Sequence, residues 1–104
     1  MTRTEFARKL GHLLVYAEDQ GFDILIGWVL RDRETQQRMF DKGLSKCDGV
    51  SKISAHQTGK AADIYIIENG KISEDKKKYK NLHAFWAVLG GKPMLDWDAG
   101  HFEV

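Results

Sequence analysis

Ser54–Ile64 reads SAHQTGKAADI, and in this stretch a polar loop gives way to an apolar strand. The run Ala61–Ile67 is rich in branched apolar residues, which predicts a strand. His56 lies at the loop end and Asp63 lies inside the strand, with Gly59 among the small residues between them. A carboxylate surrounded by alanine and isoleucine is a poor core residue unless a partner compensates its charge. A divalent cation is one such partner; a solvent-facing aspartate beside a loop histidine is the alternative.

The segments before this stretch predict two helices and one more strand. Thr2 begins a capping-box pattern, and an apolar stripe at helical spacing predicts a helix over residues 2–19. The bulky run 22–30 predicts a strand that is largely buried. Asp32 has the character of an N-cap and opens a second helix that ends at a glycine. The polar residues 44–53 are expected to form a loop over the site.

The segments after it predict a hairpin, a third helix and a last strand. Asn69-Gly70 is a pair that tolerates positive φ and favours a tight turn. Ser73 is predicted to cap a helix that stops at Gly90-Gly91, and residues 100–104 are predicted to form the final strand. The buried stripe of that helix is expected to be Leu82, Phe85, Trp86 and Leu89. This order of elements predicts an α+β fold, with helices packed on a small, mainly antiparallel sheet.

Composition limits the classes of function. A chain of 104 residues forms one domain, residues 1–104. Its net charge of +1 gives no strong case for nucleic-acid binding. The basic run at 76–80 is a weak indication of an anionic partner, and we favour its interpretation as a solvated helix start. The single cysteine, Cys47, excludes an intramolecular disulfide and a cysteine-based zinc site. We find no apolar segment long enough for a membrane span and no signal peptide, so we expect synthesis in the cytoplasm and no membrane insertion.

Residues 97–103, WDAGHFE, offer a second set of polar groups. With His101 as a third ligand beside His56 and Asp63, one zinc ion could be held with a coordination position left open. Zinc in such a site lowers the pKa of a bound water to about 7, so that the water attacks a carbonyl at neutral pH. The other two histidines of the chain lie in predicted helices, and we interpret them as surface or structural residues.

Two carboxylates flank His101. Asp98 is the candidate base that takes the proton from the water and returns it to the leaving amine. Glu103 either orients a ligand imidazole or lies exposed near the end of the chain, and the sequence does not distinguish the two. Trp97 and Phe102 are expected to shield the site from water.

These residues together resemble the M15 family of zinc peptidases. The first pattern is Ser54-x-His56-x-x-Gly59-x-Ala61-x-Asp63, and the second is Asp98-x-x-His101-Phe102-Glu103. Upstream, Gly27-x-x-x-Arg31-x-x-x-x-Gln36 is similar to the family's arginine-and-glutamine segment. The family contains D-alanyl-D-alanine carboxypeptidases and dipeptidases and the L-alanyl-D-glutamate peptidases of phage endolysins. It implies a fold of the Hedgehog and DD-peptidase type.

The resemblance implies a role for each matched residue. His56, Asp63 and His101 would bind one zinc ion per chain, and Asp98 would be the general base. Aspartate at the base position is typical of the endolysin-like branch, whereas carboxypeptidases commonly have glutamate there. Arg31 would hold or polarise the substrate near the scissile carbonyl, and its spacing to Gln36 favours it over the neighbouring arginine. Ser54 and Gln36 would contribute to substrate binding, although Ser54 could instead only shape its turn.

The implied function is hydrolysis of peptidoglycan stem peptides, with the L-alanyl-D-glutamate bond as the first expectation. D-alanyl-D-alanine carboxypeptidase or dipeptidase activity is the second. A non-catalytic zinc module like the Hedgehog signalling domain is the third. The short chain and the missing export signal fit a phage-type lysis enzyme, a monomer that reaches the wall after release by a separate pore-forming protein. The sequence does not identify the cleaved bond, the target wall, the physiological metal or the role of Cys47.

Overall fold

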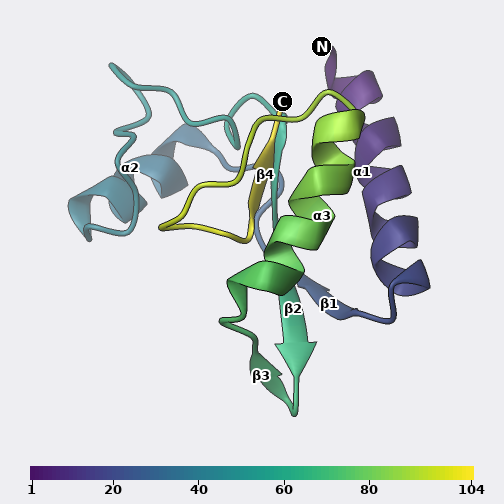
Figure 1. Cartoon of the computed structure of the whole chain (residues 1–104). Coiled ribbons are helices and arrows are strands. Elements are labelled where there is room, and N and C mark those ends of the chain that lie inside the picture. The colour runs from purple at the N-terminus through teal and green to yellow at the C-terminus, as the bar shows by residue number, and fades with distance from the viewer.

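The computed structural model describes residues 1–104 and has the predicted α+β architecture (Figure 1). Three helices and four short antiparallel strands follow one another in the predicted order. They are α1 (Arg3–Asp19), β1 (Asp23–Ile26), α2 (Arg33–Asp41), β2 (Ala61–Glu68), β3 (Lys71–Ile72), α3 (Lys76–Val88) and β4 (His101–Glu103).

The sheet is organised around β2, the strand predicted from Ala61 onward. The N–H of Asp63 donates to the carbonyl oxygen of Trp28 at 2.8 Å, whereas the N–H of Ile64 donates to Gly100 at 2.7 Å. Successive residues of β2 therefore bond to opposite edges, with β1 along one edge and β3 and β4 along the other. Every pairing is antiparallel, and β4 is in register so that Asp63 faces His101.

The two faces of β2 have different environments, as the side-chain alternation of a strand requires. Ala62, Ile64 and Ile66 are at most 1% exposed and point toward α1 and α3, which lie side by side over one face of the sheet (Figure 1). Asp63 and Tyr65 point to the other face, where α2 and the loop after it lie. The core on the helical face also contains Phe6, Leu13, Ala17, Tyr79, Leu82, Trp86 and Phe102.

Two of the three predicted helix starts are confirmed, and the third is wrong. The side chains of Thr2 and Asp32 accept hydrogen bonds from backbone N–H groups in the first turns of α1 and α2, which satisfies donors that a helix leaves free. For α3 the cap is Asp75, whose carboxylate accepts from the N–H of Lys77. The Ser73 hydroxyl instead accepts from the N–H of Asp75, and the N–H of Ser73 donates to Ile66 of β2, so the chain is still paired with the sheet at that point.

The predicted strand over residues 22–30 is shorter and more exposed than expected. β1 ends at Ile26, and Leu25 and Ile26 are 52% and 47% exposed. The strand ends where Gly27 and Trp28 together lie opposite Asp63: Gly27 donates to the carbonyl oxygen of Asp63, and Asp63 donates to Trp28. Two residues facing one is the arrangement of a β-bulge, which bends the strand. Burial was predicted from the apolar side chains of this run, but apolar residues at the edge of a sheet can remain exposed.

Candidate metal centre

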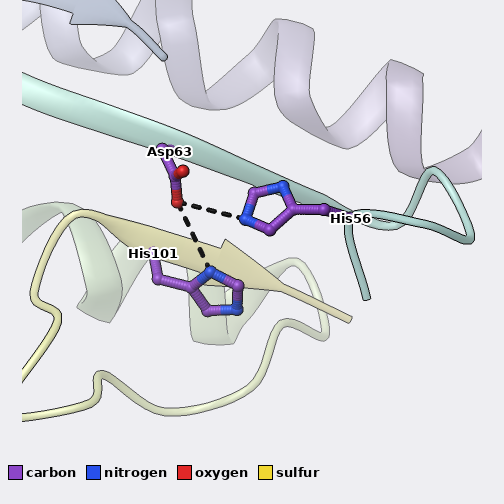
Figure 2. A group of neighbouring side chains, drawn as sticks. All are labelled: His56, Asp63 and His101. Carbon is purple, nitrogen blue, oxygen red and sulfur yellow. Dashed lines mark ion pairs between the residues drawn. The ribbon is translucent and has the colours of Figure 1, made fainter. Parts of the chain in front are cut away.

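Three side chains from separate parts of the chain converge beside β2 (Figure 2). Asp63 comes from β2, His101 from the facing residue of β4, and His56 from the turn that precedes β2. His56 Nε2 lies 3.2 Å and His101 Nδ1 lies 3.5 Å from the same oxygen, Asp63 Oδ1. One ligand atom from each residue lies within 4.8 Å of the others. The structure thus brings together the three residues that were predicted from the sequence to be metal ligands.

His56 is held so that one ring nitrogen is available to the site. Its Nδ1 lies 3.2 Å from the carbonyl oxygen of Val29, which can only accept, so Nδ1 carries the proton. The lone pair is then on Nε2, the atom that faces Asp63. The backbone of His56 is also tied, because its N–H donates to Ser54 Oγ and its carbonyl accepts from the N–H of Arg31. The ring is 3% exposed and has little freedom to turn.

His101 is held in the same manner through its other nitrogen. Nε2 lies 3.1 Å from Glu103 Oε1, and a carboxylate acceptor there places the proton on Nε2. The lone pair of Nδ1 therefore faces Asp63. Glu103 reaches the ring because residues two apart in a strand share a face. Of the two roles considered for Glu103, the geometry favours orienting the imidazole over lying exposed.

The resulting electrostatics favour a cation in the centre. Two nitrogen lone pairs and an ionised carboxylate point at one another, and they repel unless a positive charge lies between them. Burial raises the pKa of Asp63, but hydrogen bonding with His101 and His56, which requires a proton on the nitrogen that faces Asp63, outweighs it and holds that pKa at about 2. The carboxylate is therefore ionised whether a proton or a metal cation lies between the groups. Burial likewise lowers the pKa of His101, yet Asp63 and Glu103 outweigh it and raise the pKa above its ordinary value.

The donor set fits zinc. Tetrahedral zinc with nitrogen and oxygen ligands at about 2.0–2.1 Å separates its ligand atoms by about 3.3 Å. The two histidine–carboxylate separations of 3.2 and 3.5 Å match that value closely. Both imidazoles donate their outer N–H to an acceptor, as metal-bound histidines almost always do. Three protein ligands would leave one position open, which distinguishes catalytic from structural zinc sites.

Arg31 lies beside this triad and is 5% exposed. Its Nη2 is 3.7 Å from Asp63 Oδ2, and its Nη1 donates to Gln36 Oε1 at 2.7 Å. Burial lowers the pKa of Arg31, and the charge of Asp63 opposes that shift. Gln36 is fully buried, and its amide donates to Ser45 Oγ and to the carbonyl oxygen of Cys47, both at 2.7 Å. Gln36 thus connects Arg31 to the loop after α2.

A cavity of about 550 Å³ opens over the triad. Arg31, Ser54 and Asp98 line it, but Gln36 does not, because its side chain lies behind Arg31. The Asp98 carboxylate faces this cavity without a hydrogen-bond partner in the protein, and burial, followed by the charge of Asp63, raises its pKa. A carboxylate with a raised pKa and a free lone pair is suited to accept a proton.

The two aromatic residues expected to shield the site behave differently. Trp97 stands at the cavity mouth, 64% exposed, with Lys46 Nζ 4.6 Å from its ring centroid. Phe102 does not shield the site, and that expectation is wrong: it is fully buried in the core, stacked on His83 with 3.9 Å between ring centroids. Alternation along β4 directs His101 and Phe102 to opposite faces of the sheet.

Sequence reasoning overlooked Tyr65 and Lys46, which also line the cavity. Tyr65 lies two residues after Asp63 in β2 and so shares its face, a relation that the strand period alone would have shown. Burial and the carboxylates of Asp63 and Asp98 raise the pKa of Tyr65 to about 12, so its hydroxyl stays protonated at neutral pH. Lys46 had no comparable sequence pattern, since it reaches the cavity from an irregular loop.

Comparison with known proteins supports the fold. No protein-family model and no curated protein sequence matches the chain. Among solved structures, the L-Ala D-Glu endopeptidase ChiX of Serratia marcescens is similar, with a TM-score of 0.69 and 20% sequence identity over 99% of this chain and 80% of that chain. The two proteins therefore share a fold across nearly the whole chain. None of the helices here is both long and apolar enough to cross a membrane.

Proposed function

We propose that this protein is a zinc-dependent peptidase that hydrolyses peptidoglycan stem peptides, with the L-alanyl-D-glutamate bond as its target. The observation that carries the proposal is the His56–Asp63–His101 centre, whose inner lone pairs converge in an open cavity. The unpartnered carboxylate of Asp98 in that cavity supports hydrolysis over a purely structural metal site. The shared fold with an enzyme named for the L-Ala D-Glu bond supports the substrate class.

His56, Asp63 and His101 would hold the zinc ion, while Val29 and Glu103 keep the two imidazoles in the required tautomers. When bound, zinc supplies Lewis acidity, which polarises a carbonyl and makes water acidic enough to attack it at neutral pH. Asp98 would accept the proton of the attacking water and return it to the leaving amine. Its raised pKa brings it nearer to the neutral range in which both transfers must occur.

Arg31 would bind the substrate close to the scissile bond. Its guanidinium is permanently charged and suits a carbonyl or carboxylate oxygen, and Arg31 lines the cavity over the triad. Gln36 would act by positioning Arg31, since its own amide is fully bonded inside the protein. Ser54 lines the cavity and also accepts from the N–H of His56, so it would shape the turn that presents the imidazole.

We infer the biological setting from the proposed peptidase activity. We expect the protein to act as a monomer on the stem peptide, without nucleic acid and without insertion into a membrane. Cytoplasmic synthesis followed by release to the wall, as in phage lysis, is the setting that agrees with this activity. The aspartate at position 98 favours the endolysin-like branch.

The test combines metal content with product analysis. Purified protein is expected to contain one zinc per chain and to cleave muropeptides between L-alanine and D-glutamate, with activity lost on chelation and restored by zinc. His101→Ala should lose both zinc and activity. His12→Ala, at an exposed position of α1 away from the site, is the matched control and should retain both.

Each other outcome assigns a different function. Release of free D-alanine by mass spectrometry would identify a D-alanyl-D-alanine carboxypeptidase or dipeptidase. Stoichiometric zinc with no cleavage of any wall preparation would identify a non-catalytic zinc module. Folded protein without affinity for zinc would remove the metal site and the peptidase assignment with it.

A further inference from the structure

The three tyrosines of the chain differ in what their hydroxyl groups contact. The Tyr16 hydroxyl donates to Asn81 Oδ1. The Tyr79 hydroxyl accepts from the N–H of Ile66 and donates to the carbonyl oxygen of Ser73, both at 3.0 Å. The Tyr65 hydroxyl has no hydrogen-bond partner in the protein, and Tyr65 is the tyrosine that lines the cavity over the metal centre.

The Tyr65 ring occupies a slot between two glycines. A Cβ built on Gly27 would lie 3.0 Å from Cε2 of the ring, and one built on Gly100 would lie 2.8 Å from Cε1. A side chain at Gly100 would therefore collide with the ring, and one at Gly27 would be in tight contact with it. Gly27 belongs to the bulge after β1, and Gly100 directly precedes β4, so both neighbours of β2 make room for Tyr65. The ring is thereby fixed on the face of β2 that carries Asp63.

The cavity lining contains three carboxylates and two cations, Arg31 and Lys46. Asp63, Asp98 and Glu103 contribute carboxylates, which repel substrate oxygens. The terminal nitrogens of Arg31 are already directed at Gln36 and Asp63. A rigid, neutral and unpartnered O–H among these groups is suited to a substrate oxygen. When substrate displaces water from this half-buried hydroxyl, a bond to a substrate oxygen replaces the bond to water and avoids the cost of an unpaired donor.

We propose that Tyr65 is a substrate-contacting residue whose hydroxyl donates a hydrogen bond to an oxygen of the peptide bound across the His56–Asp63–His101 centre. This inference rests on the proposed peptidase function and adds to it a residue outside the patterns that suggested it. The oxygen is a carbonyl or carboxylate of the stem peptide, since those groups accept from a phenol. As the peptide carbon becomes tetrahedral, its oxygen gains charge, and a donor already in place stabilises it further.

The test is Tyr65→Phe, which removes the hydroxyl and keeps the ring in its slot. We expect kcat/KM for muropeptide cleavage to fall about tenfold, the effect of one hydrogen bond of about 1.4 kcal/mol. The affinity for a phosphinate analogue of the scissile peptide, measured by calorimetry on the zinc-loaded protein, should fall by a similar factor. Zinc stoichiometry and Tm should be unchanged. Tyr16→Phe removes a hydroxyl far from the cavity and should leave kcat/KM and analogue affinity at wild-type values.

Three results would overturn the inference. If Tyr65→Phe keeps kcat/KM and analogue affinity within twofold of an active wild type, the hydroxyl makes no contact with substrate and the peptidase assignment still stands. If the variant loses zinc or unfolds at a lower temperature, the hydroxyl has a structural role instead. An inactive wild type would overturn the proposed function itself, and the inference with it.

Discussion

Asp63 and His101 are paired residues of two antiparallel strands, and His101 Nδ1 lies 3.5 Å from Asp63 Oδ1. This pairing makes the metal centre a consequence of strand register. A shift of β4 by one residue would turn Phe102 toward the cavity and His101 into the core, because strand side chains alternate. The buried stack of Phe102 on His83 opposes such a shift. The core on one face of the sheet thus holds the ligand on the other.

Removing the shared carboxylate should remove the metal. Asp63→Asn replaces an ionised oxygen, held at a pKa of about 2, with a neutral amide in contact with both histidines. We expect zinc affinity, measured by competition with a chelator, to fall by more than about 100-fold, since loss of an outer partner alone costs about 10–100-fold. Asp23→Asn, on an exposed position of β1, is the control and should bind zinc as the wild type does. Unchanged affinity in Asp63→Asn would exclude Asp63 as a ligand.

Glu103 should affect zinc affinity only by orienting the imidazole of His101. Glu103→Ala removes the acceptor of the outer N–H of His101, and we expect zinc affinity to fall about 10–100-fold without loss of the fold. Lys92 Nζ forms an ion pair with the other carboxylate oxygen, Glu103 Oε2, at 3.4 Å. Lys92→Ala therefore provides a control for the surface ion pair, which should change affinity little. Unchanged zinc affinity in Glu103→Ala would contradict the orienting role of Glu103.

Replacing Asp98 should impair catalysis without affecting zinc binding. Asp98→Asn is expected to keep one zinc per chain and to lower kcat by about 10²–10⁴-fold, the usual contribution of a general base. Atomic absorption and a muropeptide assay on the same sample measure the two quantities. Full activity in this variant would remove Asp98 from the mechanism.

The pH profile of the wild type offers a second measurement of the same residue. Asp98 must be ionised to accept a proton, and its pKa is raised above the ordinary value of 3.8. The profile of kcat/KM should therefore have an acidic limb in which activity falls as pH falls through this raised pKa. An acidic limb that stays unchanged when Asp98 is replaced by glutamate, with its different intrinsic pKa, would assign the limb to another group.

His83 should make stability depend on pH. Its Nε2 is 2.8 Å from the carbonyl oxygen of Ala99, its Nδ1 is buried without a partner, and burial lowers its pKa below 6.5. The unfolded chain therefore takes up a proton near pH 6.5 while the folded protein resists it. Stability contributed by neutral His83 is full above pH 6.5 and is lost as pH falls from there toward the folded pKa.

The comparison that isolates this effect is His83→Phe, which keeps an aromatic ring against Phe102 and does not titrate. Denaturant unfolding of the metal-free proteins between pH 8 and pH 5 should show a smaller loss of stability in the variant than in the wild type. His101, whose pKa is raised, is present in both proteins, so the comparison removes the opposite contribution that it makes independently of His83. Parallel curves for the two proteins would contradict the predicted role of His83.

Local patterns were sufficient for most of the fold. The caps Thr2 and Asp32 and the turn at Asn69-Gly70 act over three or four residues, so sequence spacing determines them. Predictions failed where backbone pairing with a segment distant in the sequence determined the local structure. Ser73 has the chemistry of a cap, but its backbone is still paired with β2, and β1 stops because Asp63 accommodates two residues opposite it.

The sequence by itself determined which residue types could form the site: two histidines and an aspartate at suggestive positions, with a second aspartate nearby. Only the tertiary structure decided that they meet, which lone pairs face inward, and that Glu103 and Val29 hold the rings. It also placed Tyr65 in the cavity and Phe102 in the core. The physical reason is that ligand geometry depends on strand register and on contacts between segments as much as 45 residues apart, His56 and His101, which no local pattern of residues encodes.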